Sequence, residues 1–231
     1  MPHTYITNHE NLPNGINLFT SPTPNGYKAV IYLESLKIDY NVYAVDLLTD
    51  EQKSKWFLDF NLNGRIPVLI YVENNKIKHV IPESGAILLF IGKKFDTENK
   101  HYYGESHELY YNQLSWLFFQ TSHVGPMQGQ LHHFGKFSEI KEEYAIKRFN
   151  TEVHRLYQIL ENLLIKNGNG VFIGDRYTIV DFAIWPWVFR KHFAKIDLND
   201  YPNIKAWFEK LETQNFLQTA IKIPPRIAPL D

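Results

Sequence analysis

Residues 66–88 read IPVLIYVENNKIKHVIPESGAIL. The first seven residues form an apolar run rich in β-branched side chains, which is typical of a buried strand. Asn74-Asn75 then predicts a tight turn into a second strand over 76–81. From residue 83 the apolar side chains recur at helical spacing as far as residue 95. This block therefore predicts an antiparallel strand pair followed by a helix.

The residues before this block predict a strand–helix–strand–helix order. The turn at 21–26, Ser-Pro-Thr-Pro-Asn-Gly, is so rich in Pro, Asn and Gly that neither a helix nor a strand runs through it. Strands are expected at 16–20 and 40–45, and helices at 29–36 and 50–60. The complete order β-α-β-α-β-β-α over residues 16–97 predicts an α/β thioredoxin-like domain, with a mixed sheet and helices on both faces.

Strand signals stop after residue 98, and the rest of the chain is expected to be all-helical. Residues 98–104 form a polar linker, and 105–222 are expected to form an all-α domain. Gly125-Pro126 is expected to end its first helix. The other predicted segments are an irregular lead-in at 1–15, helices at 105–123, 138–166, 178–192 and 202–213, and a Pro-rich tail at 223–231.

Composition narrows the classes of function. The 231 residues include 24 Lys and Arg against 25 Asp and Glu, and this balance argues against binding nucleic acid or an anionic membrane. No apolar run approaches the roughly 18 residues that span a bilayer. The first residues lack the pattern of a secretory signal, so a cytoplasmic protein without a membrane partner is expected.

The sequence contains no cysteine. Disulfides, thiolate metal sites, cysteine nucleophiles and CxxC redox chemistry are therefore excluded. Any thiol chemistry must use a thiol that the substrate brings.

Several strings resemble those of glutathione transferases. Residues 174–181, Gly-Asp-Arg-Tyr-Thr-Ile-Val-Asp, resemble that superfamily's capping box, in which Thr178 and Asp181 close the start of a buried helix. Four further strings resemble the nu-class bacterial enzymes and the related fungal nitrogen-regulator-like group, and the resemblance covers roughly 16–222. These strings are Ser-Pro-Thr-Pro-Asn-Gly (21–26), Pro-Glu-Ser-Gly-Ala-Ile-Leu (82–88), Gly-Pro-Met-Gln-Gly-Gln-Leu-His-His-Phe (125–134) and Trp-Pro-Trp (185–187).

The resemblance implies a glutathione-dependent disulfide-bond oxidoreductase. Bound glutathione, reduced or as its disulfide, would exchange thiol for disulfide with a small substrate, with no enzyme cysteine. Two enzymatic alternatives remain open, conjugation of glutathione to electrophiles and glutathione peroxidase activity. A non-catalytic regulatory binding protein with the same fold is the third. The family also implies a two-fold homodimer. The sequence does not identify the second substrate.

The resemblance assigns the catalytic role to Thr23 and Asn25. A free thiol has a pKa near ~8.5, and hydrogen bonds to its sulfur favour the thiolate. Thr23 is expected to donate its hydroxyl to the glutathione sulfur, and Asn25 to supply a second polar contact. The alternative interpretation is that both side chains only satisfy their own turn. Ser21 is the rival hydroxyl.

Four residues are expected to bind the body of glutathione. Glu83 and Ser84 begin a helix whose free amides suit the γ-glutamyl carboxylate, while the Glu83 carboxylate suits the ammonium group. A plain N-cap is the alternative. Pro67 resembles the cis-proline of thioredoxin-like folds, which would let the backbone of Ile66 pair with the cysteinyl residue. An ordinary trans proline at the start of a strand is the alternative.

Three further contacts are expected from the resemblance. Arg65 would pair with the glycine carboxylate or remain solvated. Gln52 matches a nu-class glutathione contact. Arg148, in the helical half, matches an arginine that binds the carboxylates of the peptide.

The remaining candidates, for a metal site or for the second-substrate pocket, are histidines and aromatic residues of the helical half. His123, His132 and His133 lack carboxylates at a supporting spacing, so no metal is expected. Residues 123–134 are expected to line the mouth of the second-substrate pocket as a loop. Candidates for its apolar wall are Trp116, Phe119 and Phe134, whereas Trp185 and Trp187 are expected in the core.

Overall fold

The computed structural model describes residues 2–225, which form two compact units. The first unit contains residues 2–97 and the segment from Gln214 to Pro225, and the second contains residues 98–213. The predicted Pro-rich tail lies outside the described residues from position 226 onward. No helix within 2–225 is long and apolar enough to cross a membrane.

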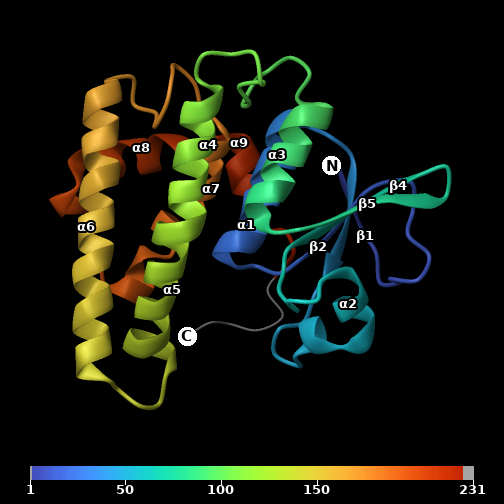
Figure 1. The fold of residues 1–231 in the computed structure, drawn as a ribbon, viewed down its shortest axis with the longest axis horizontal. Helices are drawn as coiled ribbons and strands as arrows, with labels where there is room; N and C mark the ends of the chain where they lie inside the picture. Colours follow the sequence, from blue (N-terminus) through green and yellow to red (C-terminus); the bar gives the residue numbers. More distant parts are fainter. Residues whose placement is uncertain (1, 226–231) are drawn as a thin grey trace. The chain divides into compact units, whose positions relative to one another are not determined.

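The described part of the first unit is built on a five-stranded mixed sheet (Figure 1). β1, β3 and β2 run parallel to one another, whereas β4 runs antiparallel to β2, and β5 antiparallel to β4. The strands are β1 (His3–Tyr5), β2 (Gly15–Thr20), β3 (Tyr40–Ala44), β4 (Val68–Glu73) and β5 (Lys76–Pro82), in the spatial order β1-β3-β2-β4-β5. The β-α-β unit and the hairpin are those that the sequence predicts.

Helices cover both faces of this sheet, because side chains alternate along each strand. Phe19 of β2 is buried in a cluster with Phe57 of helix α2 (Lys55–Phe60). Leu18 is fully buried and points to the opposite face, on the side of α1 (Pro24–Leu36) and α3 (Ser84–Phe95). A short 3₁₀ turn, η1 (Glu51–Lys53), precedes α2. The predicted thioredoxin-like fold is therefore confirmed.

The lead-in is not irregular, which corrects the prediction for residues 1–15. His3–Tyr5 forms β1 and pairs in parallel with β3. The Ile6 amide continues this pairing by donating to the Val42 carbonyl at 2.9 Å. A three-residue strand is too short to show an alternating apolar pattern, so the sequence carried no signal for it.

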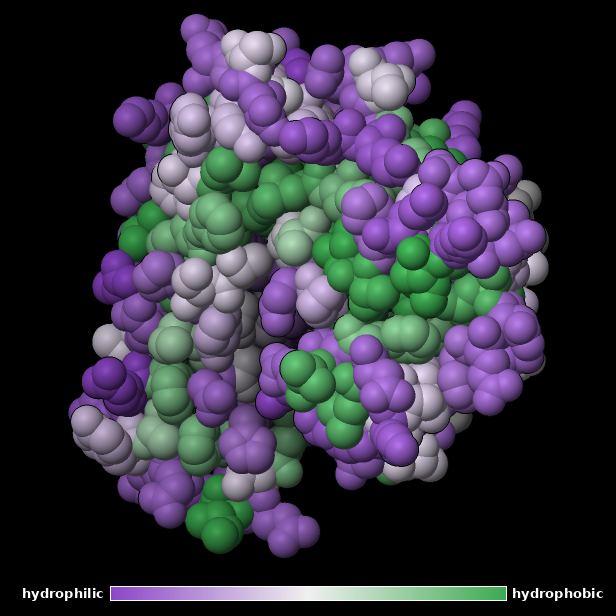
Figure 2. All heavy atoms as spheres, turned by 45° about the vertical axis from the view of Figure 1, so that its right-hand side comes forward, coloured by the Kyte–Doolittle hydropathy of each residue, from purple (hydrophilic) through white to green (hydrophobic). Residues whose placement is uncertain are grey.

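The outer strand β5 is exposed along most of its length. Ile77 and Val80 on it are 51% and 38% exposed, and Lys76 and Lys78 are exposed beside them. Figure 2 shows one face of the molecule, on which hydrophobic residues gather in patches bordered by hydrophilic ones. Lysines on an edge strand disfavour pairing with a further strand, so they help to end the sheet at β5.

Helices form the second unit, as predicted. Its long helix α6 begins at Glu143 rather than at the predicted residue 138. The elements are α4 (Tyr110–Phe119), the π-helical turn η2 (Gln120–Val124), α5 (Gly125–His132), the π-helical turn η3 (His133–Phe137), α6 (Glu143–Asn167), α7 (Ile179–Phe189), the 3₁₀ turns η4 (Lys191–Ala194) and η5 (Leu198–Asp200), and α8 (Pro202–Glu212).

Gly125-Pro126 does not break the first helix of this unit, which corrects the prediction of a loop over 123–134. The helical backbone continues from α4 through η2 into α5, and the Gly125 amide donates to the Gln120 carbonyl. Pro126 lies in the first turn of α5, where a missing N–H is tolerated. Gly125 packs closely on Trp187, since a Cβ would lie 3.3 Å from its ring.

The capping box of α7 is present as predicted. The Thr178 amide donates to Asp181 Oδ2 at 2.8 Å, and the Thr178 hydroxyl accepts from the Val180 amide at 3.2 Å. Asp181 also accepts from the Trp207 indole at 2.9 Å. Burial raises the pKa of Asp181 to about 6, although these donors act in the opposite direction.

Helix α9 (Asn215–Ala220) packs against α1 of the first unit (Figure 1). Its Leu217 and Ala220 are fully buried. The predicted helical domain ended at residue 222, whereas the structure returns the chain to the first unit at Gln214. The apolar pattern of α9 shows that it packs on something, but it does not show on which unit.

Candidate active site

The turn at 21–26 ends at the start of α1 and holds the Thr23 hydroxyl there. Thr23 is the N-cap of α1, and its Oγ1 accepts from the Gly26 amide at 3.2 Å. Position 26 has no space for a side chain, because a Cβ would collide with the Ser21 carbonyl oxygen. A hydroxyl can accept and donate at once. Thr23 therefore caps its own turn, and its hydrogen has no acceptor among residues 2–225.

The loop before β4 exposes backbone hydrogen-bonding groups. The Ile66–Pro67 bond is cis. Within residues 2–225, neither the amide nor the carbonyl of Ile66 has a hydrogen-bond partner. Asn61 holds the loop in place, because its Nδ2 donates to the Arg65 carbonyl at 2.7 Å. Free backbone groups of this kind can pair with an extended peptide.

The start of α3 also has free donors. Glu83 is its N-cap residue, with φ 73° and ψ 118°, a backbone conformation that is rare outside glycine. Neither Glu83 nor Ser84 caps the helix through its side chain. The first amides of α3 are therefore available to an anion, and the adjacent Glu83 carboxylate to a cation.

A buried lysine lies behind Ser84. Lys28 of α1 is 1% exposed, and its Nζ donates to Ser84 Oγ at 3.1 Å. Burial lowers the pKa of Lys28 to about 7, while the Glu83 carboxylate acts to raise it. Nothing in the sequence distinguished Lys28 from the other lysines, since it falls in an apolar helix face.

These elements surround a polar cavity of about 300 Å³ within the first unit. Six of the predicted residues line it, from three separate segments. They are Asn25, Arg65, Ile66, Pro67, Glu83 and Ser84. Asn61 and Asn63 line it too and were missed, although the Asn-x-Asn-Gly string before Ile66-Pro67 marks a polar turn at this place. Six of the nine predicted site residues therefore lie around one cavity.

Two predicted residues of the first unit are not among those that line the cavity. Thr23 precedes the lining residue Asn25 by two positions, at the same helix end. Gln52 lies in η1, where its Nε2 donates to Asp50 Oδ1 at 2.9 Å. Its Oε1 is buried and has no hydrogen-bond partner within residues 2–225. That oxygen is suited to a donor from a ligand.

Arg148 lies in the second unit, on the first half of α6. It lines a cavity of about 810 Å³ together with Lys147, Tyr144 and Met127. The Glu152 carboxylate lines the same cavity, so its charged lining is mixed, with two cationic side chains and one anionic one.

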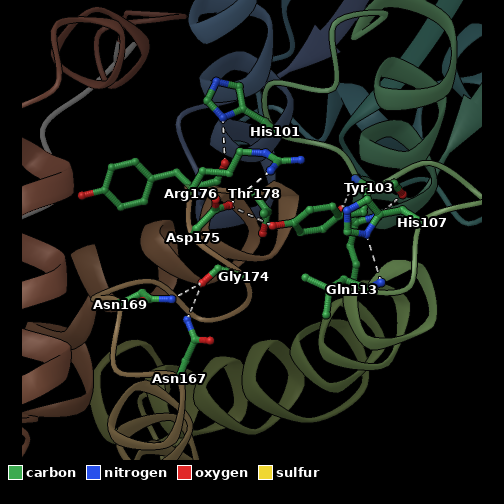
Figure 3. Close-up of polar contacts among 12 residues, drawn as sticks. His101, Tyr103, His107, Gln113, Asn167, Asn169, Gly174, Asp175, Arg176 and Thr178 are labelled. Atoms are coloured by element: carbon green, nitrogen blue, oxygen red, sulfur yellow. Dashed lines mark hydrogen bonds and ion pairs between the residues drawn. The ribbon is translucent and has the colours of Figure 1, made fainter.

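Around another cavity of the second unit, polar residues bind one another. The cavity measures about 730 Å³, and Figure 3 shows how its polar residues point toward one another. Gln113 binds both the amide and the carbonyl of Tyr103, at 3.0 and 3.2 Å. The Arg176 guanidinium stacks on the Tyr103 ring, and Asn167 donates to the Gly174 carbonyl. These contacts join the segment around 103 to the loop before α7.

The expected apolar wall does not form as one surface. Trp116 lines the 730 Å³ cavity, whereas Phe134 stacks on Phe149 with ring centroids 5.8 Å apart. Eighteen residues of nearly continuous helix separate Trp116 from Phe134, about 27 Å at the α-helical rise. Trp185 and Trp187 are buried, which confirms their predicted place in the core.

The three histidines are engaged with neighbours. His132 is buried next to Gln128, with 3.3 Å between the two Nε2 atoms, and burial lowers the pKa of His132 to about 4. His123 stacks on Phe119, and His133 contacts its neighbouring phenylalanine edge-on. Within residues 2–225, no three His, Asp or Glu side chains are grouped as metal ligands.

A thioredoxin-like unit with a polar cavity at a cis-proline, followed by an all-helical unit, is the architecture of a glutathione-linked protein. Residues 15–93 match the glutathione S-transferase N-terminal domain, and residues 89–215 match the C-terminal domain. The chain belongs to the glutathione transferase family and is a glutathione transferase-like enzyme.

Three known proteins are similar to this chain over most of its length. The disulfide-bond oxidoreductase YfcG of Escherichia coli is 37% identical over 204 residues, 86% of this chain and 91% of that protein. Glutathione S-transferase 2 of Schizosaccharomyces pombe is 31% identical, over 81% of this chain and 86% of that protein. The crystal structure of a glutathione transferase homologue from Lodderomyces elongisporus, with two glutathiones per subunit, superposes with a TM-score of 0.88. It is 37% identical, and the match covers 92% of this chain and 100% of that one.

Proposed function

We propose that the protein is a glutathione-dependent disulfide-bond oxidoreductase. One glutathione thiolate attacks a sulfur of the substrate disulfide, forming a mixed disulfide and releasing the first substrate thiolate. A second glutathione thiolate attacks the glutathione sulfur of the mixed disulfide and releases the second. The products are glutathione disulfide and two substrate thiols, once the thiolates take up protons.

The observation that carries this proposal is a free hydroxyl donor at a helix N-terminus in a chain without cysteine. Donation from Thr23 and the positive end of α1 both favour a thiolate over a thiol. Asn25 follows within the first turn of α1 and lines the cavity. In this proposal the sulfur atoms belong to the ligands alone, as the cysteine-free sequence requires.

The remaining site residues bind the glutathione peptide in this proposal. The free backbone of Ile66, beside Pro67, pairs with the cysteinyl residue. The amides of α3 with Ser84 hold the γ-glutamyl carboxylate, and Glu83 holds its ammonium group.

Further contacts of the peptide complete the proposed site. Arg65 pairs with the glycine carboxylate, and Gln52 accepts from the peptide through its unpartnered oxygen. The two glutathiones per subunit of the Lodderomyces structure support a reaction that uses two.

Turnover with a small soluble disulfide tests the proposal. The purified protein is mixed with reduced glutathione and the disulfide, and glutathione disulfide formation is followed by coupled reduction with NADPH and glutathione reductase. We expect enzyme-dependent turnover that Thr23→Ala reduces. Absence of turnover above the uncatalysed rate would remove the oxidoreductase assignment.

Conjugation of glutathione to an electrophile is the second candidate. The similarity to a protein named glutathione S-transferase 2 favours it. Both reactions need the same thiolate, so the choice depends on the second substrate. Parallel assays with an activated aryl halide and with an organic hydroperoxide separate conjugation and peroxidase activity from disulfide reduction.

We also propose a cytoplasmic homodimer. The cytoplasm supplies reduced glutathione in excess over its disulfide. Tyr111 and Phe118 of α4 are 75% and 57% exposed, and their spacing of seven places both on one helix face. Sedimentation at micromolar concentration tests the dimer, and a monomer would contradict it.

A further inference from the structure

Lys28 lies outside the glutathione cavity but touches one of its walls. The cavity is lined by Ser84, and Lys28 contacts that residue from the buried side, with 3.1 Å between Nζ and Oγ. Lys28 itself is not among the residues that line the cavity. Burying a lysine costs free energy, so the contact with Ser84 calls for an explanation.

The direction of this hydrogen bond depends on the charge of Lys28. A protonated amine has three donors and no acceptor, so Ser84 Oγ must accept from it. The Ser84 hydrogen then points away from Lys28 and is available to an acceptor in the cavity. A neutral amine has a lone pair and can accept that hydrogen instead. The Ser84 oxygen would then turn its lone pairs toward a ligand carboxylate, which is unfavourable.

The charge state of Lys28 depends on the charged groups of the elements packed around it. Glu83, at the start of α3, acts on it directly. The other charged residues of α3 are Lys93 and Lys94 in its last turn, at the opposite end from Ser84. Helix α9 and strand β2 carry no charged side chain. With a pKa of about 7, Lys28 is divided between its two forms near neutral pH.

We propose that protonated Lys28 orients the Ser84 hydroxyl as a donor to the γ-glutamyl carboxylate of glutathione, so that binding takes up a proton at Lys28. This inference rests on the glutathione site proposed above. A carboxylate at Ser84 brings a negative charge near Lys28 and favours its protonated form. By linkage, the affinity is highest below neutral pH and falls as the pH rises above 7.

Calorimetric titration with S-methylglutathione tests the inference. Its blocked thiol cannot release a proton, so the thiol of the ligand does not contribute. At each pH, titrations in buffers of different ionisation enthalpy give the number of protons taken up. We expect uptake of roughly half a proton near pH 7.5 and almost none at pH 5.5, and an affinity that falls up to about tenfold per pH unit above neutral.

Variants assign the proton to Lys28. Lys28→Met preserves the length of the side chain without its charge, and we expect it to abolish the uptake and flatten the pH profile. Ser84→Ala keeps the lysine but removes the hydroxyl that Lys28 orients. We expect this variant to reduce the dependence of affinity on pH. Lys78→Met, at an exposed position on β5, is the matched control and should behave like the wild type.

Two results overturn the inference in distinguishable ways. S-methylglutathione that binds with no proton uptake between pH 6 and 9, or with the same uptake in Lys28→Met, removes the role of Lys28 and leaves the glutathione site intact. Lack of binding at every pH removes both the site and the inference.

Discussion

Replacing Thr23 by valine removes a hydroxyl while preserving the branched shape of the side chain. The first consequence is on stability, because Oγ1 no longer accepts from the Gly26 amide at 3.2 Å. The loss of an N-cap bond costs about 1 kcal/mol. The second consequence is on chemistry, and it arises only if the hydroxyl donates to the glutathione sulfur. A hydrogen bond to a charged group contributes about 1.5–3 kcal/mol.

That range converts into observable changes. At about 1.4 kcal/mol per pKa unit, the pKa of bound glutathione should rise by roughly 1 to 2 units in Thr23→Val. If the hydrogen bond is equally strong in the transition state, kcat/KM for glutathione at neutral pH, where the free thiol is mostly protonated, should fall roughly 10- to 150-fold. Thr23→Ser keeps a hydroxyl and should retain most of both effects.

Two measurements separate the chemical role from the structural one. The ultraviolet absorbance of the thiolate, followed against pH in the enzyme complex, gives the pKa of bound glutathione. Urea denaturation gives the free energy of unfolding. A Thr23→Val protein that loses about 1 kcal/mol of stability but keeps the thiol pKa and the rate would show that the hydroxyl only caps α1.

Three further substitutions test contacts that stabilise the helical unit. Asp181→Ala should lower the free energy of unfolding by about 3–5 kcal/mol in urea denaturation, because it leaves the buried Trp207 indole and backbone donors without an acceptor; a loss below 1 kcal/mol would contradict this. Gly174→Ala should cost at least about 1 kcal/mol, since φ is +65° and a Cβ would meet the Tyr103 hydroxyl; an unchanged melting temperature would argue against it. His132, whose pKa burial lowers to about 4, should contribute stability above pH 6.5 that is lost as the pH falls toward 4. His132→Gln should therefore flatten the stability profile in that range, and an unaltered profile would refute the assignment.

The sequence predicted the first unit well, because its signals are local. The apolar runs of β2 and β4, the Pro-rich turn at 21–26 and the helical spacing of α3 each depend on neighbouring residues. The same holds for the capping box at Thr178, which is contained in four residues. Local signals of this kind predict the structure correctly where the tertiary contacts favour the same helices and strands.

The missed features depend on contacts between distant residues. β1 exists because an edge of β3 accepts it, and three residues carry no period of their own. Helix continuation through Pro126 depends on a π-helical turn that places the missing amide where it is tolerated. Lys28 becomes notable only when α1 packs on the start of α3 and brings its amine to Ser84. No pattern within either helix contains that pairing.

The return of α9 to the first unit affects how the chain is made. Synthesis proceeds from the N-terminus, so the ribosome completes β1 to α3 long before residues 215–220 emerge. Until then, the surface of α1 that α9 covers has no partner, and the unit carrying the candidate active site is incomplete. A ribosome stalled after residue 213 would hold a nascent chain with this surface uncovered, and chaperones that bind apolar segments would find it there.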